Sequence, residues 1–91
     1  MHHYLVTFDY EVASNNELIA VELRSHLEEL PNTKWFQHLP TEIILVSPLS
    51  IDEIYKVIDY PENTLRVSIS ELNKFKTNSS RTTHWLSLNN D

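Results

Sequence analysis

The 91-residue chain contains no cysteine and no glycine. Without cysteine there are no disulfides, thiolate metal ligands or thiol nucleophiles, and this composition suits a reducing cytosol. Without glycine, the phosphate-binding loops that require close backbone approach are excluded, among them the P-loop and the dinucleotide fingerprint. The turns of this chain must therefore be made by Asn, Asp and Pro.

Long apolar runs are also missing. No stretch approaches the roughly 20 apolar residues that cross a bilayer, and the N-terminus lacks the basic and then apolar layout of a signal peptide. We therefore expect a cytoplasmic protein that does not associate with a membrane. The length and the 41% hydrophobic and 22% charged fractions are those of one small globular domain.

The formal net charge of −6 is unevenly distributed. Residues 1–73 hold four Lys or Arg and twelve Asp or Glu, whereas residues 74–91 hold Lys74, Lys76 and Arg81 against Asp91. The simplest interpretation is a solvated acidic surface with a mildly basic tail. An acidic balance opposes binding to phosphate groups.

Apolar periodicity and capping residues predict four strands and two helices in residues 1–73. Capping boxes at Ser14–Glu17 and Ser50–Glu53 begin the two helices, and a hairpin joins the second strand to the third through Pro40. Residues 74–83 are expected to form a polar loop. The predicted strands span residues 2–12, 34–39, 41–47 and 65–70, with a last short strand at 84–88, and the helices end near Pro31 and Pro61.

This order fits an α+β, ferredoxin-like βαββαβ sandwich with a four-stranded antiparallel sheet and two helices on one face. We expect residues 1–73 to form that domain and residues 74–91 to form a polar loop and a C-terminal segment. In such a sheet the first and third strands are central, and these are the two with nearly continuous apolar runs.

Both of these strands carry apolar side chains on both faces. A sheet covered on one side alternates apolar and polar residues, yet Leu5 and Val6 are adjacent and residues 43–46 read Ile-Ile-Leu-Val. A second layer must therefore cover the other face. We expect a homodimer that packs sheet against sheet; the alternative is that the C-terminal segment folds back over its own sheet. The predicted interface residues are Leu5, Thr7, Trp85, Leu86 and Leu88.

Asp9 is unusual because aspartate is depleted in strands. It should lie near the C-terminal end of a central strand, where an unpaired carboxylate costs several kcal/mol to bury. One interpretation is that it caps the following turn. The other is that it is a catalytic acid or base, or a ligand of Mg²⁺, in which case a two-fold axis nearby would bring two carboxylates together. Such a pair could support metal-assisted phosphodiester cleavage.

An aromatic and basic cluster at Lys34, Trp35 and Phe36 could stack on a nucleobase, although such aromatic residues more often pack in a core or an interface. The predicted nucleic-acid-binding residues are Lys34, Trp35, Lys74, Lys76 and Arg81. The five histidines show no metal-ligand spacing, and no serine nucleophile elbow is present.

The opening strand Tyr4-Leu5-Val6-Thr7-Phe8-Asp9-Tyr10, ended by an acid in a chain of this layout, resembles the CRISPR-associated small nuclease family. The chain is more similar still to the SinR-like relatives of that family, through residues 34–39, residues 41–46 and the late Trp85-Leu86. The resemblance implies a homodimer with facing sheets, Asp9 near the two-fold axis, and either magnesium-dependent cleavage of RNA or DNA or a non-catalytic, DNA-holding role. The arginines that follow the opening strand in the nucleases are replaced here by residues 11–14, Glu-Val-Ala-Ser.

These observations predict a dimeric nucleic-acid-binding protein, with weak or no metal-dependent cleavage centred on Asp9. An acidic, non-enzymatic module that binds another protein as a regulator or inhibitor is the main alternative. A sensor of small ligands is a third, since one fold serves many functions.

Overall fold

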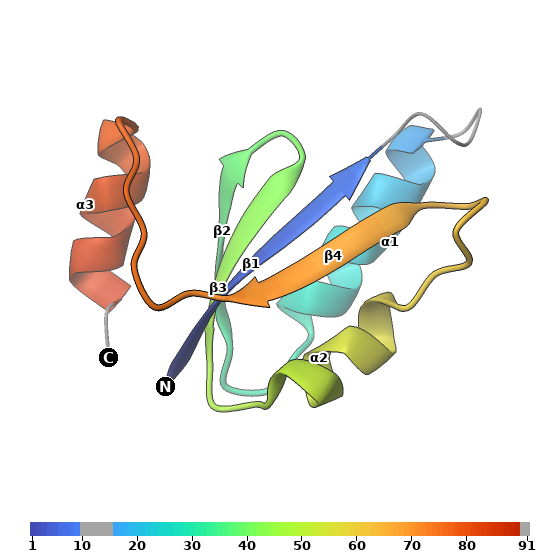
Figure 1. Cartoon of the computed structure of the whole chain (residues 1–91), viewed down its shortest axis with the longest axis horizontal. Coiled ribbons are helices and arrows are strands. Elements are labelled where there is room, and N and C mark those ends of the chain that lie inside the picture. Colours follow the sequence, from blue (N-terminus) through green and yellow to red (C-terminus); the bar gives the residue numbers. More distant parts are fainter. Residues whose placement is uncertain (10–15, 90–91) are drawn as a thin grey trace.

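The computed structural model describes residues 1–9 and 16–89 as an α+β fold of four strands and three helices (Figure 1). The predicted strand 2–12 is observed up to Asp9, and its last three residues lie outside the described part. In the described residues, no helix has the length and apolarity to cross a membrane. The elements are β1 (His2–Asp9), α1 (Asn16–Glu28), β2 (Lys34–Leu39), β3 (Glu42–Ser47), α2 (Ile51–Ile58), β4 (Arg66–Glu71) and α3 (Ser80–Asn89).

The four strands form one antiparallel sheet in the order β2-β3-β1-β4. β1 and β3 therefore occupy the two central positions, as their apolar residues predicted. β1 pairs with β3 from His2 opposite Ser47 to Thr7 opposite Glu42. The short connection at Pro40 and Thr41 makes β2 and β3 the expected hairpin.

α1 and α2 cover one face of the sheet and enclose the main core (Figure 1). Alternate residues of the central strands point into it, because successive side chains of a strand face opposite sides. The buried core residues are Tyr4, Val6, Phe8, Ala20, Leu23, Leu27, Ile43, Leu45, Ile54, Ile58 and Leu65.

The helix ends use the polar residues that a chain without glycine requires. The capping box at Ser50 is present: Glu53 N donates to Ser50 Oγ over 3.2 Å, and Ser50 N donates to the Glu53 carboxylate over 3.0 Å. After α1, Asn32 adopts φ 54°, the left-handed conformation that asparagine tolerates better than most residues. The capping box predicted at Ser14 lies outside the described residues.

The prediction for the C-terminal segment was wrong. Residues 80–89 form the helix α3, where a polar loop and a short strand were expected. The residues that α3 turns toward the rest of the chain are Thr82, Trp85, Leu86 and Asn89, at the i, i+3, i+4, i+7 spacing of a helix face. Because two of these four are polar, the apolar residues alone did not reveal the helical period.

α3 lies against part of the second face of the sheet, at β2 and β3, on the side away from α1 and α2 (Figure 1). The ring of Trp85 stacks on that of Phe36 in β2, with centroids 5.3 Å apart. Phe36 is opposite Ile44, and both Ile44 and Val46 are fully buried on this face. The layer that the apolar strands required is thus supplied within the chain, which was the alternative to the homodimer.

Tyr60 links the segment before β4 to α1. Its hydroxyl donates to the Glu22 carboxylate over 3.1 Å, and burial, followed by this bond and the Glu22 charge, raises the pKa of Tyr60 to about 12. Because the folded state holds the neutral phenol, the resulting stability is present below about pH 10 and is lost as the pH rises toward about 12.

We therefore expect the free energy of unfolding to fall more steeply above about pH 10 in the native chain than in Tyr60→Phe. At neutral pH the substitution should cost about 1 kcal/mol or less, because the bond lies at the surface. Urea unfolding at a series of alkaline pH values measures both. Parallel declines in the two chains would show that Tyr60 does not contribute to this dependence.

Candidate functional site

The second face of the sheet has two unlike halves. Over β2 and β3 it is apolar and covered by α3, whereas over β1 and β4 it carries mainly polar side chains. The register places Leu5 opposite Ser70, Thr7 opposite Ser68 and Asp9 opposite Arg66. Both halves contain residues that the sequence singled out.

Asp9 forms an ion pair with Arg66 in the polar half. Arg66 Nη2 donates to Asp9 Oδ2 over 2.5 Å. The Arg66 side chain is 47% exposed and the Asp9 side chain is 44% exposed. The pair borders an open hollow of about 350 Å³ lined by Thr7, Phe8, Asp9, Arg66 and Ser68. Since both charges are exposed, their attraction stabilises the fold by no more than about 1 kcal/mol.

These residues do not fit a magnesium ion in a single chain. Mg²⁺ requires near-octahedral oxygen ligands, but the Asp9 carboxylate is engaged by a guanidinium group. Within residues 1–9 and 16–89, no group of three or more His, Asp or Glu side chains could hold a metal ion. In one copy of the chain, Asp9 is therefore a partner of Arg66, and no metal-dependent step follows from its geometry.

Strand alternation places Trp35 on one face of β2 and Lys34 and Phe36 on the other. Lys34 and Phe36 are opposite Val46 and Ile44 on the face of α3, whereas Trp35 is opposite Leu45 on the face of α1 and α2. Lys34 and Trp35 therefore cannot contact one nucleobase together from the same side of the sheet. Phe36 is the aromatic residue that shares a face with Lys34.

Arg81 joins this face from α3. Its guanidinium lies 5.0 Å from the centre of the Phe36 ring, which also stacks on Trp85. A cation over an aromatic face is worth about 0.5 to 1 kcal/mol at an exposed site, and the guanidinium keeps donors for other ligands. α3 is thereby fixed to β2 through an arginine that remains exposed.

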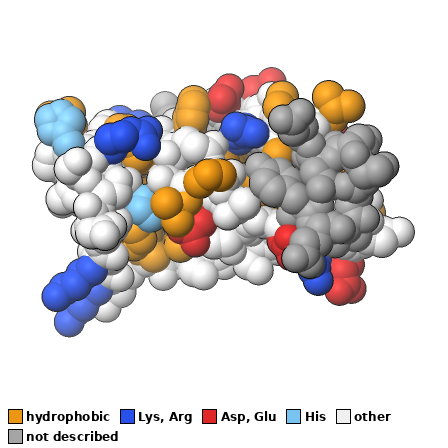
Figure 2. Space-filling view, turned by 90° about the horizontal axis from the view of Figure 1, so that it is seen from above, with side chains coloured by type: hydrophobic (Ala, Val, Ile, Leu, Met, Phe, Trp, Pro, Cys, Tyr) orange, Lys and Arg blue, Asp and Glu red, His pale blue; other side chains and the backbone are white. Residues whose placement is uncertain are grey.

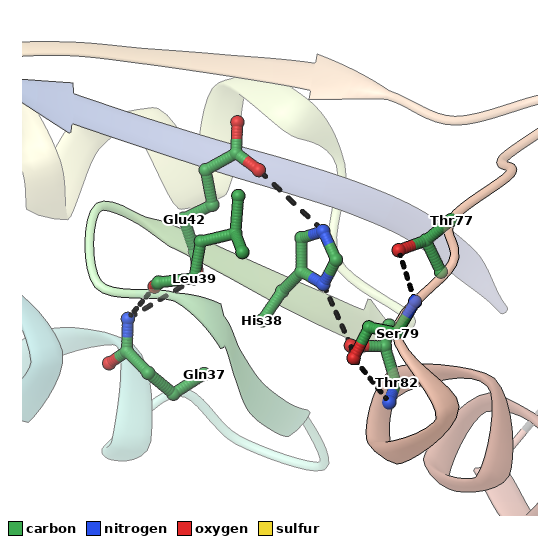
Figure 3. A network of polar contacts seen from close by, with 7 residues as sticks. All are labelled: Gln37, His38, Leu39, Glu42, Thr77, Ser79 and Thr82. Carbon is green, nitrogen blue, oxygen red and sulfur yellow. Dashed lines mark hydrogen bonds and ion pairs between the residues drawn. The ribbon is translucent and has the colours of Figure 1, made fainter.

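A polar network anchors the start of α3 to the hairpin (Figure 3). His38 is buried, with Nδ1 at 2.7 Å from Thr82 Oγ1 and Nε2 at 3.8 Å from the Glu42 carboxylate. Thr82 Oγ1 also donates to Ser79 Oγ, which accepts from Thr82 N as a helix N-cap does. Carboxylate, imidazole and hydroxyl follow in the order of a nucleophile relay, but the Thr82 hydroxyl donates to Ser79 and therefore accepts from His38 Nδ1, the reverse of a relay. Thr82 is fully buried, however, so this network holds the helix and does not present a nucleophile.

The remaining predicted residues are spread over both halves of the face. Lys74 and Lys76 are exposed in the connection before α3. Of the predicted interface residues, Leu5 and Thr7 are half-buried in the polar half, Trp85 packs on Phe36, Leu86 lines a cavity, and Leu88 is 69% exposed. Trp85 thus has a partner within its own chain, where a second copy was expected to provide one.

Sequence reasoning did not identify Arg66, His38 or Thr82. The pairing of Arg66 with Asp9 depends on the register between β1 and β4, which no local pattern gives. His38 offered a signal, because a histidine inside a strand that is otherwise half apolar must find a partner when buried. The partner is 44 residues away in the sequence.

Comparison of the chain with protein-family models, with curated proteins and with solved structures gives no match. The site is therefore interpreted from its own residues.

Proposed function

We propose that this chain binds single-stranded nucleic acid through a basic segment, residues 72–89, together with Lys34, and that one copy of the chain does not cleave it. The basic segment carries Lys74, Lys76 and Arg81 and contains no Asp or Glu. All three cationic side chains are exposed. This separation of charge is the observation that carries the proposal.

The charge separation extends over the whole molecule. Most of the carboxylates belong to residues 16–65, which include the helix layer of α1 and α2. Figure 2 shows Lys and Arg side chains at the α3 end of the molecule and also near the middle and the opposite end, whereas the Asp and Glu side chains lie near the middle and the opposite end. A local field of one sign attracts a polyanion even where the net charge is negative. The acidic balance therefore does not oppose binding on this side.

The aromatic residues favour a single strand over a duplex. Arg81 lies over the ring of Phe36, which stacks on Trp85. Unpaired bases stack on aromatic rings and on guanidinium planes. A duplex hides its bases and would meet only the cations. Binding by phosphate contacts and stacking requires neither a metal ion nor Asp9.

We also propose that the fold is a ferredoxin-like sandwich. The strand order and the two helices α1 and α2 on one face support a ferredoxin-like sandwich, to which α3 adds a third layer. We keep the relationship to the CRISPR-associated and SinR-like proteins as a hypothesis that rests on the sequence resemblance. Within it, the chain is better suited to the non-catalytic role, because Asp9 is paired with Arg66.

We also propose a homodimer, but one that pairs through a different surface from the one the sequence predicted. Its original reason was uncovered apolar surface, and α3 already buries Ile44 and Val46. Two copies could still pair through the polar half of the second face, where Leu5, Thr7 and Asp9 lie. Only such pairing would bring two Asp9 carboxylates together.

The experiment compares two double variants that remove the same charge. Lys74→Gln/Arg81→Gln should weaken binding to a labelled RNA or DNA of about 16 nucleotides, and it should lower the slope of log K against log salt by up to about 1.4. Arg24→Gln/Lys56→Gln, on α1 and α2, should leave both unchanged. Fluorescence anisotropy over about 0.05 to 0.2 M salt gives these values.

Equal losses in the two variants would mean that only net charge matters and would reject the basic segment as the binding surface. Tighter binding of a duplex would reject the role of stacking. Circular dichroism of both variants is the control for folding, because Arg81 also contacts Phe36. Sedimentation with and without nucleic acid gives the number of chains in the complex.

A protein-interaction module is the second candidate, and the outer surface of α1 favours it. Leu18 and Val21 are 69% and 54% exposed and lie one helical turn apart, beside the carboxylate of Glu22. Apolar groups bordered by acids suit a basic, amphipathic partner helix. Absence of nucleic-acid binding at low salt, together with loss of partner binding on charge reversal of Glu22 and Glu28, would select this candidate.

A further inference from the structure

β4 is an edge strand, and among the described residues it pairs with β1 alone (Figure 1). The other edge strand, β2, has features that prevent an edge from pairing with other chains: Lys34 at its start, Pro40 after its end, and a break in its register between Gln37 and Leu39. Residues 66–71 contain neither Lys nor Pro, and their register with β1 is unbroken. β4 is therefore the edge to which another strand can be added.

The register between β1 and β4 shows which backbone groups of β4 point outward. Leu72 N donates to His3 O over 2.7 Å, so these two residues form a hydrogen-bonded pair. Such pairs recur at every second residue of an antiparallel ladder, and the even-numbered residues of β4 are therefore bonded to β1. The N–H and C=O groups of Val67, Ile69 and Glu71 point away from β1, toward the open edge.

A hollow of about 190 Å³ lies beside this edge, between α2 and the first half of β4. Its walls include Tyr55, which is 39% exposed, the buried Leu65 and the half-buried Val67. Val67 packs against the core on the helix side of the sheet, and a residue opposite it in an added strand would place its side chain on the same side. The hollow is smaller than the roughly 300 Å³ or more of a small-molecule site, and it suits one apolar side chain.

Carboxylates lie at both ends of the open edge. Glu62 lines the hollow and is exposed. Glu71 ends β4 on the helix side of the sheet, where it contacts His2 at 2.9 Å and remains 52% exposed. The cation of β4, Arg66, is already paired with Asp9. An added strand is therefore attracted when it carries Lys or Arg at its ends.

A second copy of β4 does not meet this requirement. Its outward-facing groups are on odd-numbered residues, so two copies can pair symmetrically about Ile69, with Glu71 of one opposite Val67 of the other. That carboxylate would then point toward the hollow where Glu62 of the other copy lies. Like charges that meet across two strands are destabilising, and the edge favours a basic partner over a second copy.

We propose that the edge of β4 binds an extended segment of another protein, in which an apolar side chain is flanked by Lys or Arg. The segment adds a fifth strand to the sheet through the backbone of Val67 and Ile69. Its apolar side chain enters the hollow beside Tyr55, and its cations face Glu62 and Glu71. This surface is separate from the basic segment and from the exposed face of α1, so it stands or falls independently of the proposed function.

The probe is a labelled peptide, KTVTLTK, whose leucine is opposite Val67 when it pairs antiparallel to β4. Fluorescence anisotropy at low salt measures its affinity. The peptide ETVTLTE reverses both charges and should bind about fivefold or more weakly. KTVTLTK with an N-methylated valine keeps every side chain and loses the N–H that faces Ile69, so its affinity should also fall by about fivefold.

Two double variants of the protein test the charges. Glu62→Lys/Glu71→Lys should invert the preference, so that ETVTLTE binds more tightly than KTVTLTK. Glu28→Lys/Glu29→Lys makes the same change in net charge at the end of α1 and should keep the native preference. All four side chains are exposed, and circular dichroism is the control for folding. The same preference in both variants would overturn the proposal.

Amide hydrogen exchange follows the strand addition itself. In the free chain the amides of Val67 and Ile69 should exchange fast and those of Ser68 and Ser70 slowly, and KTVTLTK should slow only the first two. Slow exchange of Val67 and Ile69 in the free chain would show that the edge is already covered, by a second copy if it depends on protein concentration, and either result would overturn the proposal. So would absence of KTVTLTK binding, or equal affinity for the native and the N-methylated peptide.

Discussion

Ile44→Asp is expected to remove a large share of the free energy of unfolding at neutral pH and room temperature. Ile44 is fully buried on the face of β3 that α3 covers. An ionised carboxylate at that position would have no cationic partner, and an unpaired buried charge costs several kcal/mol, here about 4 or more. The total stability of a small domain is only about 5 to 15 kcal/mol. Far-ultraviolet circular dichroism and urea titration measure the loss.

Ser70→Asp is the matched control because Ser70 lies on the same face of the sheet in its uncovered half, opposite Leu5. Its side chain is exposed, so the introduced carboxylate stays hydrated. The expected cost is about 1 kcal/mol or less, the range of strand propensity. If the two variants were equally stable, α3 would not cover Ile44 in solution, and a surface for a second copy would be available again.

Leu23→Ala should be the next most destabilising of these substitutions, with a cost of about 2 to 5 kcal/mol. Leu23 is fully buried between α1 and the sheet, and its truncation removes contacts and leaves a cavity. For a domain of this size each kcal/mol lowers the melting temperature by roughly 4 to 8 °C. The drop in melting temperature should therefore be about 8 °C or more, as measured by calorimetry.

Leu18→Ala makes the same chemical change five residues earlier on the same helix. Leu18 is 69% exposed, and alanine is the better helix former, so stability should change by no more than about 0.5 kcal/mol. A large loss at Leu18 would indicate that its side chain is buried against another molecule in solution. That result would support the protein-interaction candidate.

Asp9 shows what a local sequence pattern can predict about a residue and what it cannot. The sequence correctly marked it as an acid in an apolar strand and placed it at the end of a central strand. Its partner is set by the register between β1 and β4, 57 residues apart. A carboxylate that is a plausible metal ligand as an isolated residue becomes one half of an exposed ion pair once Arg66 is opposite to it.

The sequence by itself determined the sheet and its two covering helices. Period-two and period-3.6 apolar patterns, the capping box at Ser50 and the proline after β2 act over a few residues, so they can be read without knowledge of the rest of the chain. The need for a second layer was equally visible, because Ile43 to Val46 cannot bury both of their faces against one layer of helices. Tertiary structure decided what supplies that layer. Thr82 belongs to the buried face of α3 through its contact with His38 in β2, and a polar residue reveals a buried helix face only when its partner is known.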